Sequence, residues 1–220
     1  MTDCARPQWV TKPSDDLWNN TLMIAKRDPN VPVLILEDDV QFLPRVNDYA
    51  QHIDEIVANN KCELYSLGLG CALSFPLIND TRVVIGGGSH AILYSANGRQ
   101  HLIREYGDNP SYKNSIVKNI LASLGFPWLH DCEIYYELHT LAPKEPCAVQ
   151  SCPLTDNQKE WDNIFINTVF YLTGAREDGT VYFELMHIIG TYFFGTIPLA
   201  ILTFVLFAYL IRSRLKYHWK

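Results

Sequence analysis

Three consecutive acids, Glu37, Asp38 and Asp39, follow the apolar stretch at residues 31–36. Adjacent carboxylates repel one another, so this crowding costs stability unless a cation or hydrogen-bond donors offset it. Side chains alternate along an extended segment, so Glu37 and Asp39 are expected on one side and Asp38 on the other. Magnesium-like ions often take only one or two carboxylates together with substrate phosphates. The triplet is a candidate metal–diphosphate site, and a polar strand end is the alternative.

Two other kinds of site have less support. His130, Cys132, His139, Cys147 and Cys152 lie close together in sequence, but no CxxC pair accompanies them, so structural zinc is not favoured. A Cys147–Cys152 disulfide and two free thiols remain equal alternatives. No G-x-S-x-G motif occurs, which leaves a serine hydrolase unsupported.

The elements that position the acids follow from the apolar pattern. Residues 31–36 form a continuous apolar run, which is typical of a parallel-sheet strand covered on both faces. Further strands are expected at 63–68, 81–85, 91–94 and 148–150. Helices are expected at 17–26, 46–57 and 96–106, with others beginning at 111 and near 131. The alternation predicts an α/β domain with a largely parallel sheet, which binds ligands at the carboxyl ends of its strands.

Composition and length suit one such domain with an appendage. The chain has 220 residues, 48% of them hydrophobic and 19% charged, as in a globular protein. A net charge of −6 and the lack of a basic run in the domain disfavour a nucleic-acid partner. We expect a lead-in at 1–13, the α/β domain at 14–152, a connector at 153–184, a transmembrane helix at 185–211 and a basic tail at 212–220.

The transmembrane prediction rests on residues 185–211, which contain no Asp, Glu, Lys or Arg. A spanning helix needs about 20 apolar residues. The basic tail predicts a single-pass protein with a cytosolic C-terminus and a luminal or extracytosolic domain. The sequons at Asn19 and Asn79 agree with that side, whereas the first residues show no apolar signal-peptide region. The orientation therefore stays open.

The stretch VLILEDDV resembles the acidic motif of glycosyltransferase family 25, which includes lipooligosaccharide and collagen galactosyltransferases. Further segments resemble the family in the same order: LWNNTLMIAKRDPNVPVLILEDDVQF, CELYSLGLG, GGSHAILYSANGRQHLI and FPWLHDCEIYYELHTLAPKEPCAVQS. The resemblance covers residues 17–151.

The resemblance implies a GT-A-type, Rossmann-like fold and an inverting hexosyl transfer. The donor would be UDP-galactose or UDP-glucose, and the acceptor a hydroxyl of a glycan, a lipid-linked glycan or a protein. Mn²⁺ or Mg²⁺ would be held by Asp39, with Glu37 or Asp38 assisting, and would neutralise the charge that develops on the diphosphate.

The resemblance also suggests the remaining site residues. Asp131 matches the family's late Asp and is the candidate base for the acceptor proton, with a helix N-cap as the alternative. Gly87, Gly88, Ser89 and His90 form a loop through which backbone could approach the donor sugar. A plain turn is the alternative, and a P-loop is excluded because no Gly-Lys-Ser/Thr follows.

The sequence departs from the family before the acidic motif. Members usually begin with a strand that reads Ile-Asn-Leu and an Arg-rich turn, and neither precedes Glu37 here. Part of the base and ribose pocket is therefore expected to be missing. The alternative function is a catalytically inactive, glycosyltransferase-like membrane protein with a binding or structural role.

Overall fold

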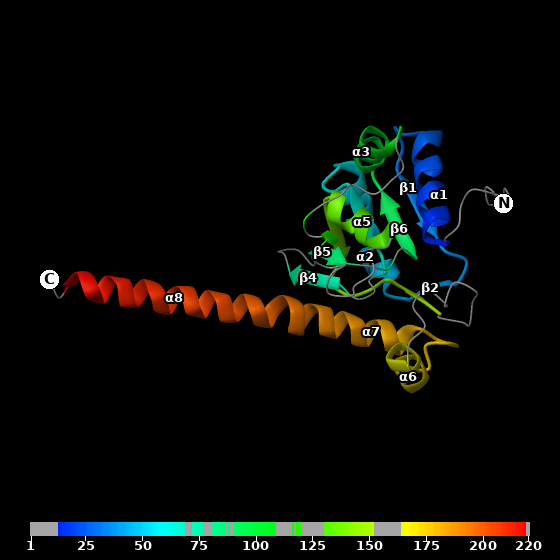
Figure 1. The fold of residues 1–220 in the computed structure, drawn as a ribbon. Coiled ribbons are helices and arrows are strands. Elements are labelled where there is room, and N and C mark those ends of the chain that lie inside the picture. Colours follow the sequence, from blue (N-terminus) through cyan, green and yellow to red (C-terminus); the bar gives the residue numbers. More distant parts are fainter. Residues whose placement is uncertain are drawn as a thin grey trace.

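The computed structural model describes residues 13–68, 72–76, 81–86, 88, 90–108, 116, 118–119, 130–151 and 164–218 (Figure 1). Its helices are α1 (Pro13–Arg27), α2 (Val46–Ala58), α3 (Ala96–Tyr106), α5 (His130–Glu137), α6 (Ile164–Thr173), α7 (Thr180–Ile188), the π-helix η2 (Ile189–Thr196) and α8 (Ile197–His218). Its strands are β1 (Val33–Leu36), β2 (Val40–Phe42), β3 (Leu64–Ser66), β4 (Ala72–Pro76), β5 (Thr81–Gly86), β6 (Ala91–Tyr94), β7 (Thr140–Pro143) and β8 (Ala148–Gln150).

Six strands form the main sheet in the order β1-β6-β3-β7-β5-β4, and β2 pairs with β8 in a second sheet. Strand β6 runs antiparallel to both β1 and β3, and β5 runs antiparallel to both β4 and β7. Only β3 and β7 pair in parallel among the described strands. The predicted mostly parallel sheet is therefore wrong, because an apolar pattern does not encode strand direction. Strands β1, β3 and β7 still point the same way, so their carboxyl ends share one edge.

Strand β1 lies at the end of the main sheet and is covered on one face only. Val33 and Ile35 pack against the core, whereas Leu34 and Leu36 are 42% and 43% exposed. The prediction of a strand buried on both faces is wrong. Because β1 lies at the edge of the sheet, only every second side chain is covered. All four residues are apolar, so the sequence does not show this alternation in burial.

Two clusters of buried side chains lie on opposite faces of the main sheet. On one face α1, α3 and α5 pack together, with Trp18 edge-on to Tyr106 at a centroid distance of 4.8 Å (Figure 1). On the other face Ile56 of α2 packs with Tyr65 of β3 and with β8. Each fully buried aliphatic or aromatic side chain of this kind contributes about 1.5–3 kcal/mol.

Helix α3 begins as predicted, and its first turn connects three elements. The Ser95 hydroxyl accepts a hydrogen bond from the Gly98 N–H at 3.1 Å, which confirms the predicted cap. The buried Arg99 guanidinium donates to the carbonyl of Ile24 in α1 at 2.6 Å and to that of Val31, before β1, at 2.5 Å. These bonds fix the strand that leads into the acids.

The C-terminal helices correct the transmembrane prediction. Helix α7 packs against β8 and η2 packs against β4, where Gly190 and Thr191 are buried. The apolar run is thus divided among three helical segments, and α8 also carries Arg212 and Arg214. Within the described residues no helix is long and apolar enough to cross a membrane. The predicted transmembrane helix at 185–211 and the single-pass membrane location are therefore wrong.

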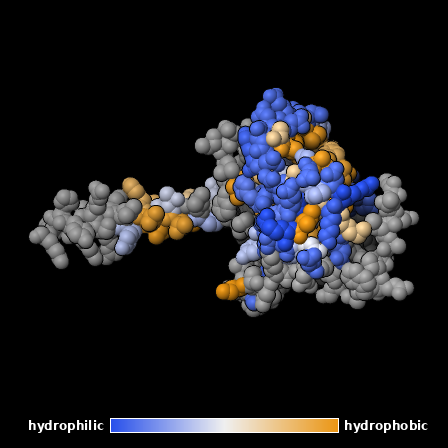
Figure 2. All heavy atoms as spheres, turned by 90° about the horizontal axis from the view of Figure 1, so that it is seen from above, coloured by the Kyte–Doolittle hydropathy of each residue, from blue (hydrophilic) through white to orange (hydrophobic). Residues whose placement is uncertain are grey.

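Helix α8 projects away from the sheet as a rod (Figure 1). Figure 2 shows apolar side chains along its described part, and Ile201, Phe204 and Phe207 are among the exposed ones.

Candidate active site

The acidic triplet forms a turn between β1 and β2, at the edge where β1, β3 and β7 end. The backbone N–H of Glu37 donates to the carbonyl of His90 at 2.9 Å, and the N–H of Ser151 donates to the carbonyl of Asp39 at 3.4 Å. The turn is therefore bound to the start of β6 on one side and to the end of β8 on the other.

Glu37 and Asp39 face the same side, as predicted, although residues 38–39 form a turn and not an extended segment. Nε2 of Gln150 donates to Oε2 of Glu37 at 2.8 Å and to Oδ2 of Asp39 at 3.0 Å. Sequence reasoning assigned Gln150 no role, although it lies in the last of the segments that resemble the family. Gln150 reaches the acids because β2 pairs with β8, which places Val40 opposite Gln150.

The Asp39 carboxylate is partly buried beside Gln150. Burial raises the pKa of Asp39, the hydrogen bonds from Gln150 and from its own backbone N–H lower it, and the charge of Asp38 adds to the increase. Within the described part of the chain, the buried Oδ1 of Asp39 has no hydrogen-bond partner. A divalent cation would give this oxygen a partner and would relieve the repulsion, so the residues present fit such an ion.

The protein supplies an incomplete set of ligands for that ion. No group of three or more His, Cys, Asp or Glu residues that could hold a metal occurs among the described residues. A cation would therefore be held by Asp39 and Glu37, with its other ligands coming from substrate oxygens and water. This division is typical of magnesium-like sites that bind a phosphate-bearing substrate.

Asp131 lies in the first turn of α5, beside the Gly-rich loop. Its Oδ2 accepts a hydrogen bond from the backbone N–H of Gly88 at 3.1 Å. Gly88 has a φ of 105°, which favours glycine. A cap on its own helix would not account for this bond to a different segment. Gly87 and Ser89, which were predicted to bind the donor sugar, lie outside the described residues.

Tyr135, one turn further along α5, lies near both Asp131 and Glu37, whose charges act on its phenol. Its hydroxyl donates to the carbonyl of Gly88 at 2.9 Å and shares a 2.6 Å hydrogen bond with the Ser66 hydroxyl. Burial raises the pKa of Tyr135, and the charges of Asp131 and Glu37 raise it further, so the phenol stays neutral. Sequence reasoning missed Tyr135, because its spacing in α5 resembles that of any buried aromatic residue.

His90 occupies the centre of this region and is fully buried. Its ring contacts Phe183 of α7 edge-on, with 4.7 Å between the ring centroids. Burial lowers the pKa of His90 to about 4, against the opposing effects of the Ala148 carbonyl and the Asp131 charge. Neither ring nitrogen makes a well-aligned hydrogen bond to a residue that the structure describes, although the Ala148 carbonyl lies close to the ring. The buried imidazole therefore stays neutral near pH 7.

Gly68, which follows β3, makes room for that ring. A Cβ at residue 68 would lie 1.9 Å from Nε2 of His90 and 2.8 Å from the Ala148 carbonyl oxygen. Every larger residue would displace the imidazole. The Leu-Gly that closes the β3 segment of the family resemblance thus has a steric role.

Hydrogen bonds link the nominated residues in two groups. Glu37 and Asp39 share the Gln150 amide, with Glu37 also bonded to the His90 carbonyl, and Asp131 is bonded to Gly88. Asp38 does not share that amide, and its predicted opposite side stays a prediction.

Cys147 does not form the disulfide that was one of the two alternatives for it. Cys147 is buried with a free thiol, and burial raises its pKa to about 12. Cys152 lies outside the described residues.

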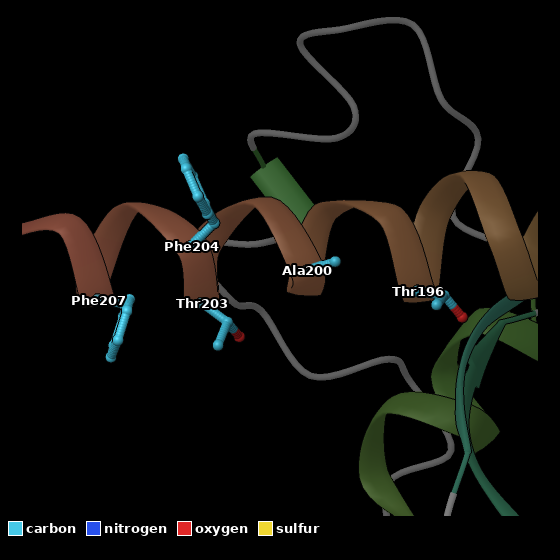
Figure 3. A pocket seen from close by; sticks show the side chains of 5 residues that line it. All are labelled: Thr196, Ala200, Thr203, Phe204 and Phe207. Carbon is cyan, nitrogen blue, oxygen red and sulfur yellow. The ribbon is translucent and has the colours of Figure 1, made fainter.

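A hollow of about 560 Å³ lies along the C-terminal rod, away from the acids (Figure 3). It is lined by Thr196, Ala200, Thr203, Phe204 and Phe207. Phe204 and Phe207 point to opposite sides of the helix (Figure 3). The hollow has no ionisable side chain in its lining, so it cannot supply the acid–base or metal chemistry of the strand edge.

No protein-family model, no curated protein and no solved structure matches this chain. The chemistry of the site therefore rests on its own residues.

Proposed function

We propose that this protein is a metal-dependent glycosyltransferase that moves a hexose from a UDP-sugar to an acceptor hydroxyl with inversion at the sugar carbon. One observation carries the proposal. Two carboxylates, Glu37 and Asp39, share one amide donor, and a third, Asp131, accepts the Gly88 N–H near enough to Tyr135 that its charge and that of Glu37 both act on the phenol. This arrangement separates a cation-binding pair from a candidate base.

The residues divide the reaction between them. Asp39 and Glu37 would hold the divalent cation, which supplies charge neutralisation at the diphosphate leaving group. Asp131 accepts the proton of the acceptor hydroxyl while the oxygen of that hydroxyl forms the new bond to the sugar carbon. The bond from that carbon to the diphosphate breaks, and UDP leaves with the electron pair.

The first test is metal-dependent binding of UDP by the full-length chain. UDP with Mn²⁺ should raise the thermal midpoint, since a ligand at 100 times its Kd stabilises the folded state by about 2.7 kcal/mol. The increase should disappear in Asp39→Ala and persist in Asp54→Ala, which removes an exposed carboxylate of α2. No metal-dependent effect of UDP at millimolar concentration would reject the donor site.

The second test separates binding from turnover. Asp131→Asn should retain UDP binding and lower the rate of UDP release from UDP-galactose or UDP-glucose by about 10²- to 10⁴-fold, as expected for loss of a general base. If the wild-type protein binds UDP but releases none from either donor with glycan acceptors present, transfer is rejected. The alternative, a nucleotide-binding protein without catalysis, would then be favoured.

A further inference from the structure

We propose that Gln150 is a positioning residue that sets the spacing and orientation of Glu37 and Asp39 before a divalent cation binds. This inference rests on the proposed metal-dependent function and assigns a role to a residue that is not itself a metal ligand. It concerns the structure of the cation site and not the identity of the sugar.

The geometry uses the full donor capacity of the Gln150 amide. A side-chain amide nitrogen carries two hydrogens, and Nε2 donates to Glu37 Oε2 at 2.8 Å and to Asp39 Oδ2 at 3.0 Å. Both acceptors are carboxylates, so both bonds are of the stronger, charge-assisted kind. They hold two groups of like charge side by side and leave Oδ1 of Asp39 for another partner.

The backbone of Gln150 is itself fixed from two directions. Gln150 ends β8, where it pairs with Val40 of β2, immediately after the acids. On the opposite side Gly179 lies so close that a Cβ there would be 1.8 Å from the Gln150 carbonyl oxygen. Ala148 and Val149, which precede it, are fully buried. The amide therefore projects from a rigid strand end, as an orienting partner of metal ligands requires.

A purely structural link between β8 and the acidic turn is the competing explanation. Such a link would change stability when it is removed, but it would not change how the folded protein binds a cation. A positioning role predicts a change in the affinity for the cation and in the geometry of its ligands. The two explanations differ in the properties of the bound metal.

The experiment titrates the full-length protein with Mn²⁺ alone and follows free and bound ion by electron paramagnetic resonance. Gln150→Leu removes both donors, and Gln150→Asn keeps an amide that is one methylene too short to reach both acids. We expect the Kd for Mn²⁺ to rise about 10- to 100-fold in Gln150→Leu, with a smaller rise in Gln150→Asn. The spectrum of the bound ion should also change in Gln150→Asn.

Gln51→Leu is the matched control. The Gln51 amide donates to one carboxylate, Glu55 Oε1, at 3.2 Å on the exposed surface of α2. The Kd and the spectrum should equal those of the wild type in this variant. Thermal unfolding without metal, measured on every variant, separates loss of folding from loss of affinity.

Each outcome decides the inference. Wild-type Mn²⁺ affinity and spectrum in folded Gln150→Leu would overturn the positioning role and leave the proposed transferase function intact. If Gln150→Leu does not fold, the same comparison applies to Gln150→Asn. If the wild-type protein binds no Mn²⁺, with or without UDP, both the positioning role and the proposed function fail.

Discussion

Acidification should destabilise this protein through His90. The ring is fully buried between Phe183 and the tight turn at Gly68, and neither nitrogen has a hydrogen-bond partner among the described residues. Burial disfavours the charged imidazolium and lowers the pKa of His90 from 6.5 to about 4, although the Ala148 carbonyl and Asp131 act in the opposite direction.

The difference between the pKa of His90 in the unfolded chain and in the folded protein sets the size of the expected loss of stability. In the unfolded chain His90 takes up a proton near pH 6.5, whereas in the folded protein it does so near pH 4. The stability that the protein has with a neutral His90 is complete above pH 6.5. It is lost as the pH falls toward 4, because the unfolded chain then binds more protons than the folded protein. One pKa unit corresponds to about 1.4 kcal/mol, so the expected loss is roughly 3 kcal/mol.

Urea unfolding between pH 7.5 and 4 measures this loss in the wild type and in His90→Gln. Carboxylates titrate in both proteins, so the quantity of interest is the wild-type free energy of unfolding minus that of the variant. This difference should fall by roughly 3 kcal/mol across the range. His139→Gln, which changes an exposed imidazole, is the matched control and should follow the wild type.

A direct titration of His90 in the wild-type protein can refute this reasoning. The carbon-13 resonance of the His90 ring should titrate with a midpoint near pH 4 in the folded protein. A midpoint at or above 6.5, or a wild-type-minus-variant difference that does not change with pH, would refute the assignment of a buried neutral imidazole. The resonance experiment needs no variant, so it holds even if His90→Gln does not fold.

Two substitutions test the supports of the site. Arg99→Met should lower the free energy of unfolding by about 2–4 kcal/mol in urea, because the partly buried carbonyls of Ile24 and Val31 lose charged donors and the Arg99 side chain itself is buried; a loss below about 1 kcal/mol would contradict this role. Gly179→Ala should cost about 1–3 kcal/mol and speed hydrogen exchange in α7, because its Cβ would overlap the Gln150 carbonyl; unchanged exchange would show that the contact is not tight.

Local chemistry made several elements predictable. Ser95 marked the start of α3 because its hydroxyl caps the first turn, and periodic apolar residues located β3, β5, β6 and α2. These features depend on residues within a few positions of one another, which a single sequence displays directly.

Long-range features were not predictable in the same way. The apolar run of β1 gave no sign that β6 would pair with it antiparallel or that Leu34 would be exposed. Gln150 reaches Glu37 across 113 positions through the pairing of β2 with β8, and sequence periodicity contains no trace of that pairing. Hydropathy likewise merged α7, η2 and α8 into one span, because it does not register the packing of η2 on β4.

The C-terminal rod gives the site a mechanical connection. Helix α7 is rooted at β8 through Gly179, and Arg45 adds a 2.6 Å ion pair to Glu184. Beyond this root α8 extends as a stiff arm of roughly 33 Å, at 1.5 Å per residue over its 22 residues. Between this root and α8, the helix η2 packs against β4. A force on α8 would therefore act on β4 before it reached the strand end that holds the two acids.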